Sequence, residues 1–279
     1  MTILPYPQTG PRLSPRARAD VEELPRPGAA SDGDAQTRRA VLFDFGDTLV
    51  HFGRINRRRL FLRAALRTYQ LWEKRQVRMP GWQRYYLHQW FALHWALFKT
   101  AVLRREMDAV RYIRRACRKL WLTAPRPFYN ELTWQWYEPL ARAATLDPDA
   151  RRVLDRLQAD GYELALVSNT FLPPFVMDRH LEQLGLRDYF PVRVYSSETG
   201  YRKPHPRIFE IALERLDLDA GAVVFVGDRV DCDVRGPRRI GMRALHLAGR
   251  DADPNDCEHP AVQRLTDLPA ALADALPWR

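Results

Sequence analysis

The chain has 279 residues, with 44 Lys and Arg against 34 Asp and Glu, which gives a net charge of +10. Its 46% hydrophobic and 28% charged residues are ordinary for a soluble protein that can bury a full core. Three scattered cysteines, Cys117, Cys232 and Cys257, exclude a disulfide framework and favour a reducing, cytoplasmic location.

Residues 1–39 differ in composition from the remainder of the chain. Six prolines interrupt this stretch, which shows no apolar periodicity, so we expect a disordered N-terminal arm. The arm lacks the continuous apolar run of a signal peptide, and its five acidic residues argue against a transit peptide.

The first expected strand runs over residues 40–44 and ends in a carboxylate. Four apolar residues precede Asp44, which places its side chain at the carboxyl end of a buried strand. Ligands bind at this edge of a parallel α/β sheet, so Asp44 is a candidate nucleophile for a covalent intermediate. Strands also end in aspartate for reasons of turn chemistry, and this segment by itself leaves that alternative open.

Residues 52–147 show helical periodicity and a strong charge bias. We predict three helices, over residues 57–72, 83–103 and 105–121, with proline-containing breaks after the first and the last. Between Arg54 and Pro127 there are 19 Lys and Arg but three acidic residues, so this region carries more positive charge than the whole chain.

Eight aromatic residues fall within residues 72–98 of the same region. We expect them chiefly to pack the helices together, because a small helical domain needs large side chains for its core. The arginines are then solvated, or they draw a small anionic substrate toward the protein. Nucleic acid or an anionic membrane surface is a less favoured partner for interleaved cations and aromatics, and the oligomeric state stays open.

Polar side chains also follow two later apolar runs. Residues 163–168 predict a strand that ends in Ser168, and Asn169 follows it, so both can hydrogen-bond an anionic group. Residues 222–227 predict another strand, which leads into an acidic segment. Each ending by itself is also typical of an ordinary turn or helix cap.

The acidic segment contains Asp228, Asp231 and Asp233, whose hard oxygen ligands suit Mg²⁺. Lys203 lies between the two strands, just before a helix that begins with proline, and its ammonium can offset the charge of a nucleophile and its substrate. Solvated charges and helix capping are the plain alternatives. The order of all four segments along the chain favours a common site.

That order resembles the haloacid dehalogenase-like hydrolases, over roughly residues 40–50 and 148–275. The resemblance implies an α/β fold, with a Rossmann-like three-layer core built on a parallel sheet and an inserted α-helical cap. The core would comprise residues 40–51 and 148–279, and the cap would comprise residues 52–147. Caps of this kind close over the core and select substrates, so we expect specificity to reside in the cap.

The resemblance also implies the roles of individual residues. It implies that Asp44 is the nucleophile, Ser168 the second-motif hydroxyl and Lys203 the third-motif lysine, and that Ser168, Asn169 and Lys203 contact the substrate. It implies that Mg²⁺ is held by Asp44, the backbone carbonyl of Gly46 and Asp228, with Asp233 as a further candidate. The favoured activity is an Mg²⁺-dependent phosphatase that acts on a small phosphorylated compound through an aspartyl-phosphate.

Gly46 departs from the pattern of the family's phosphatases, which carry a general-acid aspartate at this position. Asp47 places an acid one residue later, and proton transfer by such an acid is typically worth about 10²–10⁴-fold. Family branches that lack it, the 2-haloacid dehalogenases and phosphonoacetaldehyde hydrolases, are therefore alternatives. Dehalogenases dispense with magnesium, so Asp228 and Asp233 favour a metal-using enzyme. A catalytically weak protein that binds nucleic acid or membrane through its basic cap is the remaining alternative.

Overall fold

The computed structural model describes residues 38–103, 108–249 and 259–274, with side chains from 97 to 103 and at 274 left out. The predicted N-terminal arm, except for its last two residues, lies outside the described residues. The strands are β1 (Arg39–Phe43), β2 (Val50–His51), β3 (Thr145–Leu146), β4 (Tyr162–Ser168), β5 (Val192–Tyr195), β6 (Val223–Gly227), β7 (Arg243–Leu247) and β8 (Ala261–Val262). The helices are α1 (Arg57–Glu73), α2 (Trp82–Leu103), α3 (Ala109–Arg118), α4 (Arg126–Ala143), α5 (Ala150–Ala159), α6 (Pro174–Gln183), α7 (Ser196–Thr199), α8 (Pro206–Leu216), α9 (Gly236–Arg238) and α10 (Leu268–Asp274).

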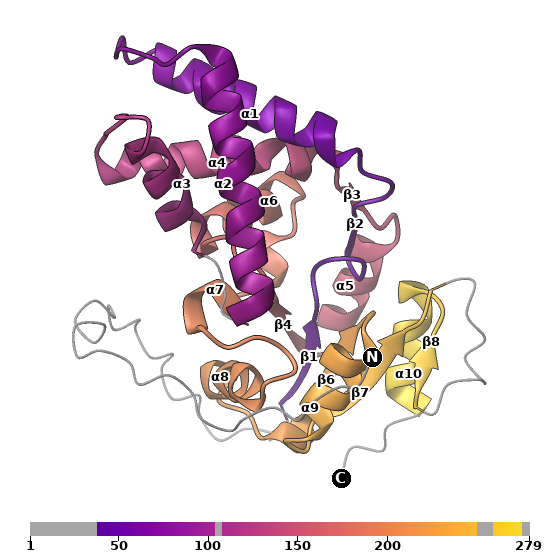
Figure 1. Cartoon of the computed structure of the whole chain (residues 1–279). Coiled ribbons are helices and arrows are strands. Elements are labelled where there is room, and N and C mark those ends of the chain that lie inside the picture. Colours follow the sequence, from indigo (N-terminus) through magenta and orange to yellow (C-terminus); the bar gives the residue numbers. More distant parts are fainter. Residues whose placement is uncertain (1–37, 104–107, 250–258, 275–279) are drawn as a thin grey trace. The chain divides into compact units, whose positions relative to one another are not determined.

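Six strands form a parallel sheet in the order β5-β4-β1-β6-β7-β8 (Figure 1). The three strands predicted from apolar runs are β4, β1 and β6, and they are direct neighbours at the centre of the sheet. Their register places Phe43 beside Leu166 on one side and beside Val226 on the other. The carboxyl ends of these three strands therefore meet at one edge.

Helices cover both faces of the sheet, and the alternation of side chains along β1 explains how. Val41 and Phe43 point to a core shared with α5, α6 and α10, whereas Ala40 and Leu42 point to a second core shared with α8. Successive residues of a strand face opposite sides, so a strand buried on both sides must be apolar throughout. The predicted three-layer α/β fold is confirmed.

Helices α1 to α4, residues 57–143, form a helical insertion between β2 and β3 (Figure 1). The two short strands pair antiparallel, Val50 with Leu146, and close the insertion at its base. A separate core holds its helices together, and it is largely aromatic and aliphatic: Trp72, Tyr85, Ile113, Cys117, Leu120, Leu122, Tyr129 and Leu132.

The fourth helix of the insertion, α4, did not follow from periodicity. Pro125 and Pro127 indicated a break, but a proline in the first helical turn leaves no hydrogen bond unmade and begins α4. Pro139 lies inside the helix, which nonetheless continues to Ala143. Of the described helices, none has the length and apolar character needed to cross a membrane.

Candidate active site

The site lies at the carboxyl edge of the sheet, where β4, β1 and β6 end side by side. Asp44 directly follows β1, Ser168 is the last residue of β4, and Asp228 directly follows β6. The Asp44 amide donates a hydrogen bond to the Val226 carbonyl over 2.9 Å and so ties the two ends together. The structure thus brings the predicted strand-end residues to one place.

Lys203 reaches the same place from the loop between α7 and α8. Its Nζ lies 2.9 Å from Asp44 Oδ1 and 2.7 Å from Asp233 Oδ1. All three side chains are buried, Asp233 completely. Removing the lysine would leave two carboxylate charges uncompensated out of water, whereas removing either carboxylate leaves the lysine one partner.

Burial opposes the charge of Lys203, but the carboxylates of Asp44 and Asp233 outweigh it and hold the pKa of Lys203 above its usual value. The ammonium is therefore charged at neutral pH. It also lies 4.9 Å from the centre of the Phe225 ring, whose face attracts a cation.

Asn169 holds the backbone of Lys203 through both ends of its amide. Its Nδ2 donates to the Lys203 carbonyl over 3.0 Å, and its Oδ1 accepts from the Lys203 amide over 2.8 Å. Asn169, which we predict to contact substrate, therefore also positions the lysine. Ser168 differs, because its hydroxyl makes no hydrogen bond within the part of the chain that the structure describes.

Asp44, Asp228 and Asp233 form an acidic cluster in which one oxygen of each lies within 4.8 Å of the others. Burial, followed by the charges of Asp44 and Asp233, raises the pKa of Asp228 to about 6. Asp228 Oδ1 is buried and has no hydrogen-bond partner among the described residues. Crowded, partly orphaned carboxylate oxygens fit a hard divalent cation such as Mg²⁺.

The three acids are not equivalent, because Asp233 is already engaged. Besides its ion pair with Lys203, its Oδ2 accepts a hydrogen bond from the Arg229 amide over 3.0 Å. Asp44 Oδ1 accepts from the Phe45 amide over 2.7 Å and pairs with Lys203, whereas its Oδ2 has no such partner within the described ranges. The donors that remain for a cation belong mainly to Asp44 and Asp228.

Gly46 and Asp47 lie in the tight turn that follows Asp44. A Cβ at Gly46 would meet only Phe52 Cε2, at 3.5 Å, so the backbone leaves room for a side chain there. Asp47 is exposed, has a left-handed φ of 55°, and adds its charge to the groups that raise the pKa of Asp228. An acid is thus present beside the cluster, one residue away from the position that the family's phosphatases use.

The family model of the haloacid dehalogenase-like hydrolases matches residues 38–241, well over half of the chain. The chain belongs to the haloacid dehalogenase-like hydrolases. The match includes every strand-end residue of the site described above, together with Lys203 and Asp233.

Named relatives of this hydrolase include phosphatases. It is 33% identical over 174 residues to the ribulose-1,5-bisphosphate 5-phosphatase of Halopiger xanaduensis, which covers 56% of this chain and 70% of the relative. It is 35% identical over 98 residues to the glyceraldehyde 3-phosphate phosphatase of Pyrococcus abyssi, which covers 35% of this chain and 40% of the relative. The hydrolase thus spans a little over two thirds of the first relative and less than half of the second.

Among solved structures, the hydrolase is similar to the 2-haloacid dehalogenase of Pseudomonas syringae. The two share 23% of their residues with a TM-score of 0.57, over 85% of this chain and 98% of the other. At this identity the likeness supports the fold alone and does not distinguish a phosphatase from a dehalogenase.

Gly227, the last residue of β6, is required by the close approach of Asp233. A Cβ at position 227 would lie 2.6 Å from Asp233 Cβ, Cγ and Oδ2. We expect Gly227→Ala to displace Asp233, misplace Lys203 and lower hydrolysis by about tenfold or more, with a stability loss of roughly 1–3 kcal/mol. Steady-state kinetics and urea unfolding measure both effects. Gly221→Ala, where a Cβ meets nothing within 4 Å, is the matched control; equal behaviour of the two variants would contradict the argument.

His180 on α6 is a residue that sequence patterns did not single out. Its Nδ1 lies 2.9 Å from the Tyr137 hydroxyl of α4, and its ring packs edge-on against Phe45, 5.3 Å between centroids. It thereby connects the helical insertion with the residue after Asp44. No local signal marks it, because both partners are distant in sequence.

Because the His180 imidazole is buried, we expect the stability of the fold to depend on pH. Burial lowers the pKa of His180 to about 4, below its value of about 6.5 in an unfolded chain. The unfolded state therefore binds more protons between these values, and stability falls as the pH drops from 6.5 toward 4, by roughly 2 kcal/mol between pH 7 and pH 5. Urea unfolding should show a smaller fall over this window for His180→Gln, and parallel curves would contradict the assignment.

Proposed function

We propose that this hydrolase is a magnesium-dependent phosphatase for a small phosphorylated compound and works through an aspartyl-phosphate. The observation that carries the proposal is the arrangement of Asp44, with one oxygen held by Lys203 and the Phe45 amide and the other without such a partner. Two relatives named as phosphatases support it.

In the proposed reaction, Asp44 Oδ2 attacks phosphorus and forms a new P–O bond, while the bond to the ester oxygen breaks and the leaving group departs as an alkoxide or phenolate, which takes its proton from water. The held Oδ1 keeps the carboxylate oriented for this attack. Ser168 donates its hydroxyl to a phosphoryl oxygen, and the Lys203 ammonium offsets the negative charge that gathers there. Water then cleaves the acyl-phosphate, releases phosphate and restores Asp44.

Asp44, Asp228 and the backbone carbonyl of Gly46 would hold Mg²⁺, with Asp233 placing Lys203 beside them. When bound, the cation supplies positive charge that balances the carboxylates and the phosphoryl group. Burial, followed by the charges of Asp44 and Asp233, raises the pKa of Asp228 to about 6, so a bound cation would stabilise the charged form of this acid.

We also propose that the chain divides into a core of residues 40–51 and 148–279 and a substrate-selecting cap of residues 52–147. We further propose that the enzyme is cytoplasmic.

The second candidate is a dehalogenase- or phosphonatase-like hydrolase, and Gly46 is the observation that favours it. Without an acid at this position, the expulsion of a poor alkoxide leaving group lacks proton transfer. Carbon–halogen cleavage needs no such proton, because halide leaves as a stable anion. Asp228 speaks against a dehalogenase. Attack by Asp44 beside Lys203 on a carbon–halogen bond needs no cation, so that reaction would give Asp228 no role as a cation ligand.

The test is turnover of a panel of phosphate esters and 2-haloacids by the full chain, with Mg²⁺ and with excess chelator. We expect phosphate release that needs Mg²⁺ and that is faster for phenolic esters, which leave readily, than for alkyl esters. Halide release that persists in chelator would replace the phosphatase by the dehalogenase. Folded protein that turns over neither class would overturn both proposals.

A further inference from the structure

One face of the helical insertion exposes apolar side chains that its core does not use. Leu87, Phe91 and Trp95 of α2 are 51%, 68% and 59% exposed. Their spacing of four residues places them in one line along the helix. Most aromatics of the insertion pack as expected, and Tyr86 and Trp90 contact Phe61 of α1. The exposed line is thus left over after the helices have packed.

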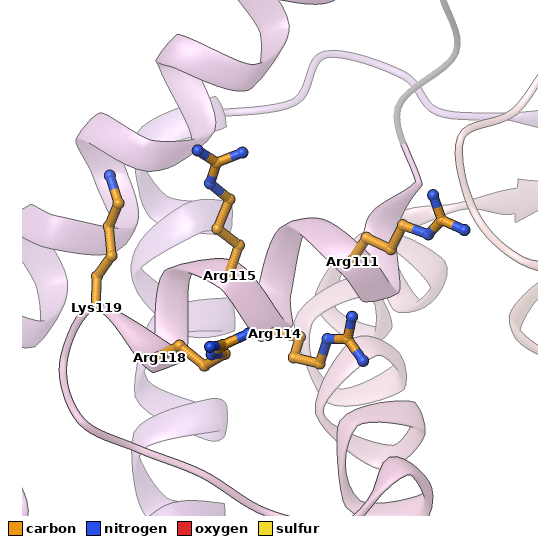
Figure 2. Close-up of a pocket in the computed structure, with 5 residues that line it drawn as sticks. All are labelled: Arg111, Arg114, Arg115, Arg118 and Lys119. Carbon is orange, nitrogen blue, oxygen red and sulfur yellow. The ribbon is translucent and has the colours of Figure 1, made fainter.

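The neighbouring helix α3 presents a dense group of cations. Arg111, Arg114, Arg115, Arg118 and Lys119 line an open hollow of about 540 Å³ (Figure 2). Of these five, only Arg111 has an acidic partner within the described residues, Asp108 at 3.1 Å. Such a concentration of unpaired charge repels itself and is relieved by an anionic partner.

The helices that carry the apolar line and the cations contact each other directly. His88 Nε2 of α2 lies 3.0 Å from the Ala116 carbonyl of α3, and the Tyr112 hydroxyl donates to the Gln89 carbonyl over 3.2 Å. Burial lowers the pKa of His88, and the nearby charges of Lys119 and Arg84 lower it further. His88, the sequence neighbour of Leu87, therefore lies at the contact between the two helices and near the charge of Lys119.

We propose that this α2–α3 face, formed by Leu87, Phe91, Trp95, Arg115, Arg118 and Lys119, docks on the surface of an anionic lipid bilayer. The cations complement the headgroups, each adding to the attraction near such a surface. Leucine and phenylalanine side chains gain from burial at the boundary of the acyl chains, and tryptophan favours the headgroup level. Helices α2 and α3 would then lie on the membrane surface and would not cross the bilayer.

A further aromatic side chain fits this arrangement. Trp121, two residues beyond Lys119, is 89% exposed and has a left-handed φ of 62°. Its neighbours Leu120 and Leu122 are buried, so the backbone conformation turns the indole outward between two anchored residues. An exposed indole beside a cationic surface is the pattern of an interfacial anchor.

Two other partners explain the face less well. Single-stranded nucleic acid would use the cations and could stack on the aromatics, but it gains little from the exposed Leu87. A second copy of the chain would bury the apolar line, but a symmetric contact would bring the α3 cations of both copies toward one another. Charge complementarity selects the bilayer.

The test is flotation of the full chain with vesicles of phosphatidylcholine alone and of phosphatidylcholine mixed with phosphatidylglycerol. We expect binding to the mixed vesicles that weakens with added salt and little binding to the neutral ones. The double variant R118Q/K119Q should bind roughly 25-fold more weakly, about fivefold for each cation. Leu87→Gln with Phe91→Gln should also lose binding while keeping its thermal unfolding transition.

The matched control is R238Q/R239Q, which removes the same charge from two exposed positions, the last residue of α9 and the residue after it. It should bind as the unchanged chain does. Equal loss in the control, or no binding to anionic vesicles, would overturn the proposal. Binding of a single-stranded oligonucleotide in place of vesicles would assign the face to nucleic acid instead. Dimers that light scattering detects for the unchanged chain, but not for the variant with Leu87→Gln and Phe91→Gln, would assign it to a second copy of the chain. Phosphatase activity measured alongside separates this outcome from the proposed chemistry.

Discussion

Replacement of Asp44 by Asn is expected to lower the turnover of phosphate esters by at least about 10⁴-fold while the protein stays folded. The amide is isosteric with the carboxylate but cannot form an acyl-phosphate. Lys203 keeps its second partner, Asp233, 2.7 Å away, so its buried charge remains compensated. Initial rates under saturating Mg²⁺ and thermal unfolding measure the two effects.

Asp231→Asn is the matched control for this variant. Asp231 is exposed in the same acidic segment as Asp228 and pairs with Arg235 over 2.9 Å, so the charge change is the same without contact to Asp44. We expect it to retain nearly full turnover. Substantial activity in the Asp44→Asn protein would remove Asp44 from the role of nucleophile, since no other described carboxylate has the same free oxygen beside Lys203.

The second large effect is a gain of activity. Gly46→Asp should raise the hydrolysis of alkyl phosphates by about 10²–10⁴-fold, because it installs a proton donor for the leaving alkoxide. A Cβ at this position meets only Phe52 Cε2, at an ordinary contact distance of 3.5 Å, so the first atom of the new side chain fits without a clash. Esters of phenols, whose leaving groups need no proton, should gain far less. The ratio of kcat/KM for the two ester classes is the measurement.

Gly46→Asn separates the acid from the bulk of the new side chain. It has the size of the aspartate but no carboxyl proton, so it should show no gain on alkyl phosphates. If Gly46→Asp shows no gain either, the acid comes from another residue, and Asp47 is the first to examine. Loss of alkyl phosphate turnover in Asp47→Asn would then identify it, because its charge already reaches Asp228.

The two predictions address different halves of the site. By the resemblance drawn from the sequence, Asp44 and Lys203 form the part that the family shares, and Gly46 is where this chain departs from its phosphatases. A hydrolase that keeps the first part without the second acid is suited to substrates whose leaving group departs unaided.

Sequence patterns alone located the central strands and the residues at their ends. Runs such as 40–44 and 163–168 are apolar because both faces of those strands are covered, and that property is local. The positions of Asp44, Ser168 and Asp228 at strand ends could also be predicted, because the end of an apolar run can be read from the sequence. Helix α4 did not follow, since a proline that begins a helix is locally similar to one that ends it.

The tertiary structure alone decided how these side chains use their hydrogen bonds. Asn169 is predicted from the sequence to contact substrate, and the fold adds that both ends of its amide hold Lys203, 34 residues away. Likewise Asp233 pairs with Lys203, and Gly227 has to be glycine because Asp233 approaches it so closely. Composition showed that the insertion is basic and aromatic, but only packing decided that Phe91 faces solvent whereas Trp72 is buried. Partners and exposure depend on which segments meet in space, and the local pattern of a chain does not contain that information.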